Sequence, residues 1–536
     1  MPAAFSLAGG LSEQPEKKSD MPNIVNIVNF IRACEPRRPD IDLVLPVRRQ
    51  IDLARKHGLP TTWLLQYDAL IDDRFYPLIR DEANPGDEVG IWFEVVQPLV
   101  EKAGLKWRGR FPWDWHSHVG FSVGYTPAER ERLADVFMAE FKKRFGRHPT
   151  PMGSWFFDAH LLGYLADRYG LQQACNCKEQ WGTDGYSLWG GYYNQAYYPS
   201  RLNALMPAQT RANQIDVPVF RMLGSDPIYQ YDCGRGGVSQ GVVTLEPVYC
   251  GNGGGGKPDW VRWFLDQLCG TPALTFGYAQ VGQENSFGWP AMEAGLTDQY
   301  ARVAELRDAG ALRVETLEAT GAWFKSRWPL TPPSAFMALG DWKNEGRKSV
   351  WFDTKHYRVN LLWERGELWI RDIHMFDETY TERYLREVCP TPDCLYDTLP
   401  VVDGNLWTTG EGRAGLRFVR VDPSGGAAPL RGGEPVVTEE AGTALRVAWP
   451  LDGGGAMELR LSERGIRAEA AGQAWGLQGQ GMDLARSTVT RVNPGGLDFC
   501  HQGHRYSLDV ARGQPADMRT GSGWFVRAVD GVVELG

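Results

Sequence analysis

Carboxylates are the most frequent residues in this sequence at the places where chemistry is expected. Between Ile24 and about Thr320, each strand that the hydrophobic pattern predicts ends in polar side chains, most of them acidic. Two facing carboxyl groups are the minimum equipment for cleaving a glycosidic bond. The polar residues at these ends are Arg32, Glu35, Gln66, Asp68, Glu88, Glu94, Asp158, His160, Glu179, Asp184, Arg221, Asp226, Gln280 and Glu284.

Aromatic rings concentrate in the segment CNCKEQWGTDGYSLWGGYYNQAYYPSRLN, residues 175–203. Flat rings stack on sugar faces, so Trp181, Trp189 and Tyr192 are candidate sugar-binding residues. Glu179 and Asp184 could bind sugar hydroxyls, and either of them could instead be a catalytic carboxylate. The alternative is a structural loop that packs on itself.

Further side chains are expected to line the same cleft. Arg221 and Asp226 follow a predicted strand and precede two tyrosines, although an internal ion pair of Arg221 would explain that residue equally well. The remaining candidates for substrate contact are Arg32, Glu35, Trp92, His116 and Trp289.

The histidines do not favour a metal enzyme. His116 and His118 form the only close pair in this region, and a pair without an evident third ligand more often lines a site through hydrogen bonds. The segment GNGGGGKP is similar to a phosphate-binding loop, but Pro258 stands where the hydroxyl residue is required. We therefore expect neither a metal nor another cofactor.

The elements that must position these residues alternate between short apolar runs and helical stretches. Such an alternation predicts βαβ units and a parallel sheet, most simply a (β/α)7-type, TIM-like barrel that carries its site at the strand C-termini. The predicted strands are Ile24–Ile31, Thr61–Gln66, Glu88–Glu94, Met152–Phe157, Gln173–Cys177, Val217–Leu223 and Ala273–Tyr278. The predicted helices are Val47–His57, Glu129–Phe145, His160–Tyr169 and Pro258–Cys269, and Thr126 with Glu129 predicts a capping box.

The pattern changes after Trp328. A Pro-rich joint, WPLTPPSAF, is followed by runs that alternate apolar and polar residues between Gly or Pro turns. This alternation is typical of an antiparallel β-sandwich. We therefore divide the chain into a flexible leader (1–21), a catalytic barrel (22–328) and a β-sandwich domain (329–536).

Composition limits the function classes. With 57 Lys and Arg against 66 Asp and Glu, the net charge is -9 and no basic block occurs, which argues against nucleic-acid binding. No apolar run approaches the roughly 18–20 residues of a membrane helix. The leader lacks the features of a signal peptide, and an odd count of 9 Cys is no disulfide framework, so we expect a cytoplasmic protein. The sequence is compatible with a monomer and with a homo-oligomer.

Three segments resemble a known superfamily, the (β/α)7-barrel glycoside hydrolases and NodB-like polysaccharide deacetylases, and remotely glycoside hydrolase family 57. IVNFIRACEP is similar to the family's opening motif, with Arg32 and Cys34 where histidines stand and Glu35 in place of a Gln. GSWFFDAHLLGYLADRYG resembles the nucleophile motif and puts Asp158 on the nucleophile position. GQENSFGWPAMEAG resembles the acid/base motif, in which Glu284 is the nearest carboxylate.

The resemblance implies a two-carboxylate, retaining glycoside hydrolase with Asp158 as nucleophile and Glu284 as acid/base. Physical reasoning supports the same pair. Helix-end N–H groups would keep Asp158 ionised, and the apolar neighbours of Glu284 would raise its pKa, as a general acid needs. The structural alternatives are a helix N-cap for Asp158 and a surface-loop carboxylate for Glu284.

Two other functions remain on the same scaffold. One is a metal-dependent carbohydrate deacetylase, although Trp92 stands near the place where the resemblance puts a metal-binding His. The other is a catalytically silent carbohydrate-binding protein that uses the aromatic segment. In each case we expect a carbohydrate as the bound partner.

Overall fold

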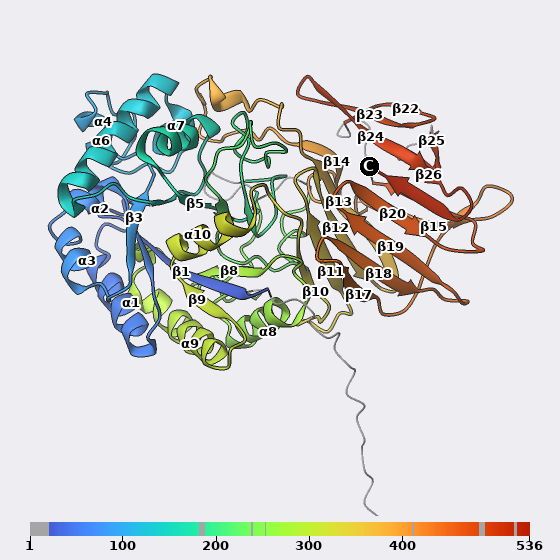
Figure 1. Ribbon diagram of the computed structural model, residues 1–536, viewed down its shortest axis with the longest axis horizontal. Coiled ribbons are helices and arrows are strands. Elements are labelled where there is room, and N and C mark those ends of the chain that lie inside the picture. The colour runs from blue at the N-terminus through green and yellow to red at the C-terminus, as the bar shows by residue number, and fades with distance from the viewer. Residues whose placement is uncertain are drawn as a thin grey trace, which may run out of the picture.

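The computed structural model describes residues 21–181, 188–236, 239–251, 253–409, 412–481, 488–518 and 523–536. An α/β part and two antiparallel sheets make up the molecule (Figure 1). Helix α10 (Leu317–Arg327) is the last α-helix in these ranges, and the elements after it are strands and one short 3₁₀ turn. An α/β region followed by antiparallel β structure is thus confirmed as the fold class.

A curled parallel sheet forms the centre of the α/β part. Each of its seven main strands overlaps a predicted one: β1 (Asn23–Ile31), β2 (Thr62–Leu65), β3 (Glu88–Trp92), β4 (Pro151–Gly153), β5 (Gln173–Asn176), β7 (Val219–Arg221) and β8 (Gly277–Val281). They lie in the order β8-β1-β2-β3-β4-β5-β7, with β6 (Ala196–Tyr197) antiparallel beyond β7 and β9 (Arg313–Glu315) also beside β1. Strands β7 and β8 do not pair within the described ranges, so the sheet is a half-barrel there.

The last main strand begins later than its pattern predicts. The apolar run starts at Ala273, but Leu274 has a φ of 67°, in the left-handed region that an extended strand does not use. The chain therefore turns first, and β8 pairs with β1 only from Gly277, opposite Asn23. The segment that follows β8 consequently starts at Gly282 and contains Glu284.

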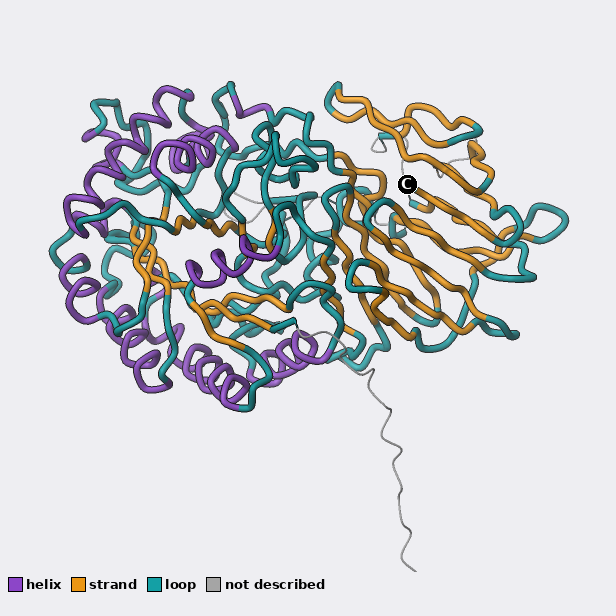
Figure 2. The backbone as a smooth tube through the Cα atoms, in the orientation of Figure 1, coloured by secondary structure: helices purple, strands orange, loops and turns teal. Residues whose placement is uncertain are grey.

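Helices cover the outer face of this sheet, as Figure 2 shows in purple. The four predicted helices are present as α1 (Val44–His57), α6 (Pro127–Phe145), α7 (Ala159–Tyr169) and α8 (Pro258–Gly270). The predicted capping box at the start of α6 is confirmed, because Thr126 accepts from the Glu129 N–H and Glu129 accepts in return. The other helices are α2 (Tyr67–Ile71), α3 (Tyr76–Glu82), α4 (Gln97–Lys102), α5 (Ser117–Gly120) and α9 (Trp289–Asp308).

Two antiparallel sheets follow. The ten-stranded sheet contains β10 (Ser334–Ala338), β11 (Lys348–Asp353), β12 (Tyr357–Glu364), β13 (Glu367–Met375), β14 (Leu399–Asp403), β15 (Gly415–Val421), β16 (Ala427–Pro429), β21 (Trp475–Gln480), β25 (Gln514–Met518) and β26 (Gly523–Arg527). The eight-stranded sheet contains β17 (Val436–Glu440), β18 (Ala444–Pro450), β19 (Ala456–Ser462), β20 (Gly465–Glu469), β22 (Val489–Asn493), β23 (Gly496–His501), β24 (His504–Arg512) and β27 (Val532–Leu535). One apolar cluster draws side chains from both sheets, for example Phe418 and Trp449, whose rings lie 6.4 Å apart.

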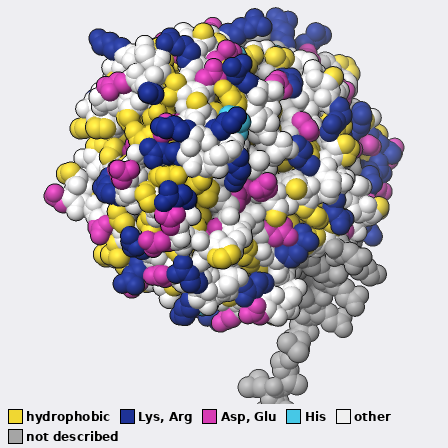
Figure 3. Space-filling view, turned by 60° about the vertical axis from the view of Figure 1, so that its left-hand side comes forward, with side chains coloured by type: hydrophobic (Ala, Val, Ile, Leu, Met, Phe, Trp, Pro, Cys, Tyr) yellow, Lys and Arg dark blue, Asp and Glu magenta, His cyan; other side chains and the backbone are white. Residues whose placement is uncertain are grey.

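The surface carries charges of both signs. Acidic and basic side chains are interspersed among apolar ones on the face drawn in Figure 3. Across the described ranges, no helix combines the length and the apolar character that a membrane crossing requires.

Candidate active site

A cavity of about 310 Å³ opens at the C-terminal ends of the parallel strands. Its walls come from the segments that follow β1, β4, β5, β7 and β8, which is where barrel-type folds carry their chemistry. The lining residues are Glu35, Arg37, Arg38, Trp155, Gln180, Val242, Glu246, Tyr249, Glu284, Ser286 and Phe287. Three glutamates therefore share one cavity with two arginines and three aromatic rings.

Glu284 is the most perturbed carboxyl of the cavity. It is 3% exposed, and burial raises its pKa to about 7, although the charge of Arg32 and a hydrogen bond from Ser286 oppose the shift. The Ser286 hydroxyl donates to Oε1 of Glu284 over 2.5 Å. A carboxyl group with such a pKa carries its proton through a large part of the neutral range and can donate it.

Arg32 lies behind the cavity at the meeting point of several carboxylates. Its Nη2 is 3.1 Å from Glu284 Oε2 and 3.3 Å from Glu94 Oε1, and its Nη1 is 3.9 Å from Glu35 Oε2. The guanidinium also lies over the Trp113 ring, 3.9 Å from its centroid. Burial raises the pKa values of Glu94 and Glu284, and the single charge of Arg32, which lowers both, does not outweigh burial.

Glu35 differs from Glu284 in its protonation. Burial opposes its ionisation, but the hydrogen bonds and charge of Arg37 outweigh burial and lower its pKa. Arg37 Nε lies 2.9 Å from Oε1, and its Nη2 donates to Oε2 over 3.0 Å. The cavity thus holds an ionised carboxylate beside a protonatable one.

Glu246 comes from the long segment between β7 and α8. Its Oε2 lies 3.3 Å from Lys178 Nζ and accepts from the Thr244 hydroxyl over 2.9 Å. Both described contacts go to Oε2, so Oε1 is left for whatever occupies the cavity.

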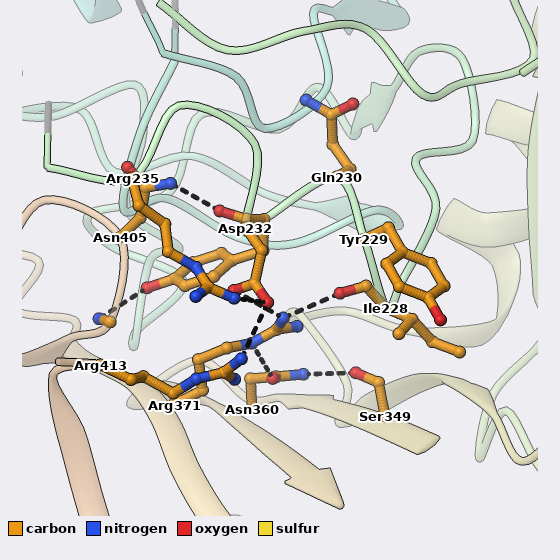
Figure 4. Close-up of polar contacts among 12 residues, drawn as sticks. Ile228, Tyr229, Gln230, Asp232, Arg235, Ser349, Asn360, Arg371, Asn405 and Arg413 are labelled. Atoms are coloured by element: carbon orange, nitrogen blue, oxygen red, sulfur yellow. Dashed lines mark hydrogen bonds and ion pairs between the residues drawn. The ribbon is translucent and has the colours of Figure 1, made fainter. Parts of the chain in front are cut away.

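The β7–α8 segment is clamped to the ten-stranded sheet. Asp232 forms ion pairs with Arg371 of β13, at 3.3 Å, and with Arg413, just before β15, at 3.2 Å (Figure 4). Arg347 and Arg235 complete the cluster. Burial opposes ionisation of Asp232, but the surrounding arginines outweigh burial and lower its pKa. The wall of the cavity that carries Glu246 is therefore held by residues far away in the sequence.

Asp158 lies outside this cavity. It caps α7, accepting from the Leu161 N–H over 2.9 Å, and pairs with the buried Arg130 at 2.9 Å. It lines a separate hollow with Glu382 and Tyr384. Asp158 therefore makes the contacts of a helix N-cap, which was the structural alternative for this residue, and it does not line the cavity of Glu284.

Several expected sugar-binding residues lie in the protein interior and are absent from the lining of the cavity. Glu179 is paired with Arg221 at 3.3 Å and with Arg358 of β12 at 2.7 Å, so the internal ion pair considered for Arg221 is present. Asp226 accepts from Trp260 and Trp342. Trp92, Trp189, Tyr192 and Trp289 are each 8% exposed or less.

The three remaining candidates for substrate contact, Trp181, His116 and Asp184, lie in different surroundings. Trp181 is partly buried and lies next to the cavity residue Gln180, with its ring 5.8 Å from that of Tyr396. The His116 side chain is 25% exposed beside Asp114, at 3.6 Å. Asp184 lies outside the described residues.

Sequence reasoning missed part of the cavity wall. Trp155, Gln180, Tyr249, Ser286 and Phe287 belong to it. Trp155 and Ser286 stood within the motif segments that drew attention to Asp158 and Glu284, so the motifs were informative beyond their carboxylates. Glu246 had no local signal, because a single carboxylate in a long irregular segment has no period or spacing that marks it.

The residues present do not fit the divalent ion of a deacetylase. The resemblance implies an Asp and two His for that ion, whereas the cavity lining contains carboxylates and no His. Within the described ranges, no group of three His, Cys, Asp or Glu side chains is arranged to hold a metal.

Comparisons with known proteins find similarity in the fold and not in the sequence. No family model matches the chain, and no curated protein matches it either. A solved structure titled a putative glycoside hydrolase/deacetylase from Parabacteroides distasonis superposes with a TM-score of 0.51 and 16% identity, over 70% of this chain and 88% of that one. The resemblance to this superfamily is thus confirmed at the level of the fold.

Two further structures are more distant. A putative polysaccharide deacetylase from Mycobacterium smegmatis has a TM-score of 0.37 and 13% identity, over 60% of this chain and 96% of that one. A branching enzyme of glycoside hydrolase family 57 from Thermococcus kodakaraensis has a TM-score of 0.29 and 9% identity, over 57% and 71% of the two chains.

Proposed function

We propose that this chain is a carbohydrate-active hydrolase that cleaves glycosidic bonds, with Glu284 as its general acid. The observation that carries the proposal is one cavity in which a buried carboxyl with a pKa of about 7, Glu284, lies near a second carboxyl whose pKa is lowered, Glu35, and near Glu246. Two carboxyl groups in opposite protonation states are what acid-assisted glycoside cleavage requires. The aromatic rings of Trp155, Tyr249 and Phe287 offer apolar faces to a sugar.

Glu246 is our candidate for the second carboxylate. It lines the cavity of Glu284, its Oε2 is held by Lys178 and Thr244, and its Oε1 is left for substrate. Glu35 is a weaker candidate, because both of its oxygens are already bound by Arg37. We no longer assign the nucleophile to Asp158, since it lines a different hollow.

The proposed reaction follows from these positions. Glu284 gives its proton to the glycosidic oxygen as the bond to the anomeric carbon breaks, while a Glu246 oxygen attacks that carbon. Water then attacks the glycosyl–enzyme ester, and the ionised Glu284 takes the water's proton, which restores both carboxyl groups. Retention of configuration is the outcome that the family resemblance favours, and the anomer of the first product, followed by NMR, tests it.

The test compares Glu284→Gln and Glu246→Gln with wild type on nitrophenyl glycosides and oligosaccharides. Loss of a positioned acid is expected to reduce kcat by about 10²–10⁴-fold. Glu88→Gln is the matched control: Glu88 is also buried with a pKa raised to about 7, but it opens β3 at the opposite end of the sheet. A control that loses as much activity as Glu284→Gln would refute the assignment.

Two other outcomes would replace the proposal. Release of acetate from acetylated saccharides, without cleavage of the chain, would identify a deacetylase. Saccharide binding with no product after long incubation would identify a binding protein.

A further inference from the structure

A row of stacked groups runs outward from two arginines at the cavity, Arg32 and Arg37, onto the segment WRGRFPWDWHSH, residues 107–118. Arg32, which contacts Glu284, lies over Trp113. Arg37, a wall residue of the cavity, lies 5.2 Å from the Trp113 centroid and 5.0 Å from that of Trp115. The row continues from Trp115 to Phe111, whose ring is nearly parallel to it at 5.9 Å and 12°.

Exposure rises along this row. Trp113 is fully buried, Trp115 is partly buried, and Phe111 is 38% exposed. In the described part of the chain, Phe111 is one of three exposed large apolar side chains, with Leu395 and Val436. Phe111 therefore stays in contact with water beside the partly buried Trp115, at the outer end of the row.

The turn that presents Phe111 is firmly built. The Trp107 indole N–H donates to the Phe111 carbonyl over 2.9 Å, and the Gln97 N–H donates to the Pro112 carbonyl over 2.8 Å. The Trp107 ring also lies so close to Gly109 that a Cβ there would come within 2.3 Å of it. Phe111 is therefore held outward by an ordered turn.

The charges along the row are neutralised in pairs. Arg37 is bound to Glu35 at 2.9 Å, and Arg110, which lies over Trp115 at 4.7 Å, is bound to Asp114 at 2.8 Å. Because both arginines are paired, they add no excess of positive charge to the row, whose outermost ring, Phe111, is the exposed one. Such a surface suits a neutral sugar ring better than an acidic one.

We propose that Phe111 and Trp115 form a stacking platform for a neutral pyranose unit of a polysaccharide whose adjoining units occupy the cavity. The substrate class that this platform implies is a polysaccharide of neutral sugars. This inference rests on the proposed function for the saccharide class, but binding at the platform requires no catalysis.

The test measures binding and turnover separately. Affinity electrophoresis with soluble neutral polysaccharides (β-glucan, starch, xylan) compares Phe111→Ala and Trp115→Ala with the ring-preserving Phe111→Tyr and with Val436→Ala, an exposed apolar site on β17. We expect Phe111→Ala to weaken binding of one polymer about 3- to 10-fold, and the two control variants to bind like wild type. KM for long oligosaccharides should rise equally, with kcat and the kinetics of nitrophenyl monoglycosides unchanged.

The platform is wrong if Phe111→Ala binds every polymer as wild type does, if wild type binds none, or if an oligogalacturonide binds more tightly than any neutral chain. These results are independent of Glu284. If Glu284→Gln keeps full hydrolytic activity while Phe111→Ala loses binding, the proposed acid fails and the platform stands.

Discussion

Arg32 and Glu284 meet beneath the cavity, with Nη2 of the guanidinium 3.1 Å from Oε2 of the carboxyl group and both side chains at most 4% exposed. The same arginine also contacts Glu94 and Glu35, so it is shared among carboxylates and does not fix the charge of any one of them. Glu284 can therefore exist protonated or ionised near neutral pH.

The pH profile of kcat/KM should report Glu284. A general acid works in its protonated form, so activity should fall as the pH rises through about 7, the pKa of this group. Because the Ser286 hydroxyl stabilises the ionised form, Ser286→Ala should raise this pKa and move the alkaline limb to higher pH. Ser122→Ala, which removes another buried hydroxyl, serves as the control, and a limb that stays fixed or moves to lower pH in Ser286→Ala contradicts the assignment.

Asp158→Asn should lower stability more than activity. The change keeps a side-chain oxygen that can cap α7, but it leaves Arg130 buried without its carboxylate, a loss of about 3–5 kcal/mol when a buried pair is broken. Denaturant unfolding measures this loss, and Asp167→Asn, in a solvent-exposed pair with Arg201, should cost less than about 1 kcal/mol. A variant that stays stable but loses turnover would return Asp158 to the catalytic pair.

Asp232→Asn should weaken the wall that carries Glu246. Removing the charge leaves Arg371 and Arg413 buried with less compensation, so unfolding free energy should fall by a few kcal/mol. The native arrangement holds the Asp232 pKa below its usual value, so its contribution is present above about pH 4 and is lost as the pH falls below that. The destabilisation of the variant should therefore be largest at pH 7 and should become progressively smaller as the pH falls below about 4, toward the lowered pKa of the folded state. A loss that does not shrink at all as the pH falls below about 4 would show that the charge is not the cause.

Buried carboxyl groups should make the protein less stable as the pH rises. Burial raises the pKa of Asp68 to about 6, of Glu88 and Glu284 to about 7, and of Glu382 to about 8. The folded chain therefore binds more protons than the unfolded chain between about pH 4 and 8, so stability present below this window is lost across it. Tm should be higher at pH 5.5 than at pH 8.5, and Glu88→Gln should reduce the difference. A Tm that rises with pH over this range would contradict these shifts.

Local patterns predicted the elements well. The strands around Phe30 and Ile91 and the capping box at Thr126 depend on neighbours in sequence, so a period or a short motif was enough. Leu274 shows the limit, because its left-handed backbone lies inside an apolar run that reads as a strand.

The site was only partly predictable. Glu35 and Glu284 follow strands directly, so the position of the strand ends was sufficient to find them. Trp189 and Tyr192 were misread as cleft residues, because a ring-rich loop looks the same whether it faces a sugar or another sheet. In the structure, Trp189 donates to Asp403 and Tyr192 donates to the Pro332 carbonyl, both far away in the chain.

The ion pairs of Asp232 with Arg371 on β13 and with Arg413, just before β15, limit how the two parts of the chain can be exchanged in evolution. A recombination that replaced the sheets with those of a distant relative would keep the glutamates of the half-barrel but lose the anchors of one wall. Only exchanges that carry Arg371 and Arg413 together with Asp232 would preserve that wall. The two parts are therefore expected to be inherited as one unit. A change in the length of the Pro-rich segment between them should disturb the cavity wall less than the loss of Asp232, Arg371 or Arg413.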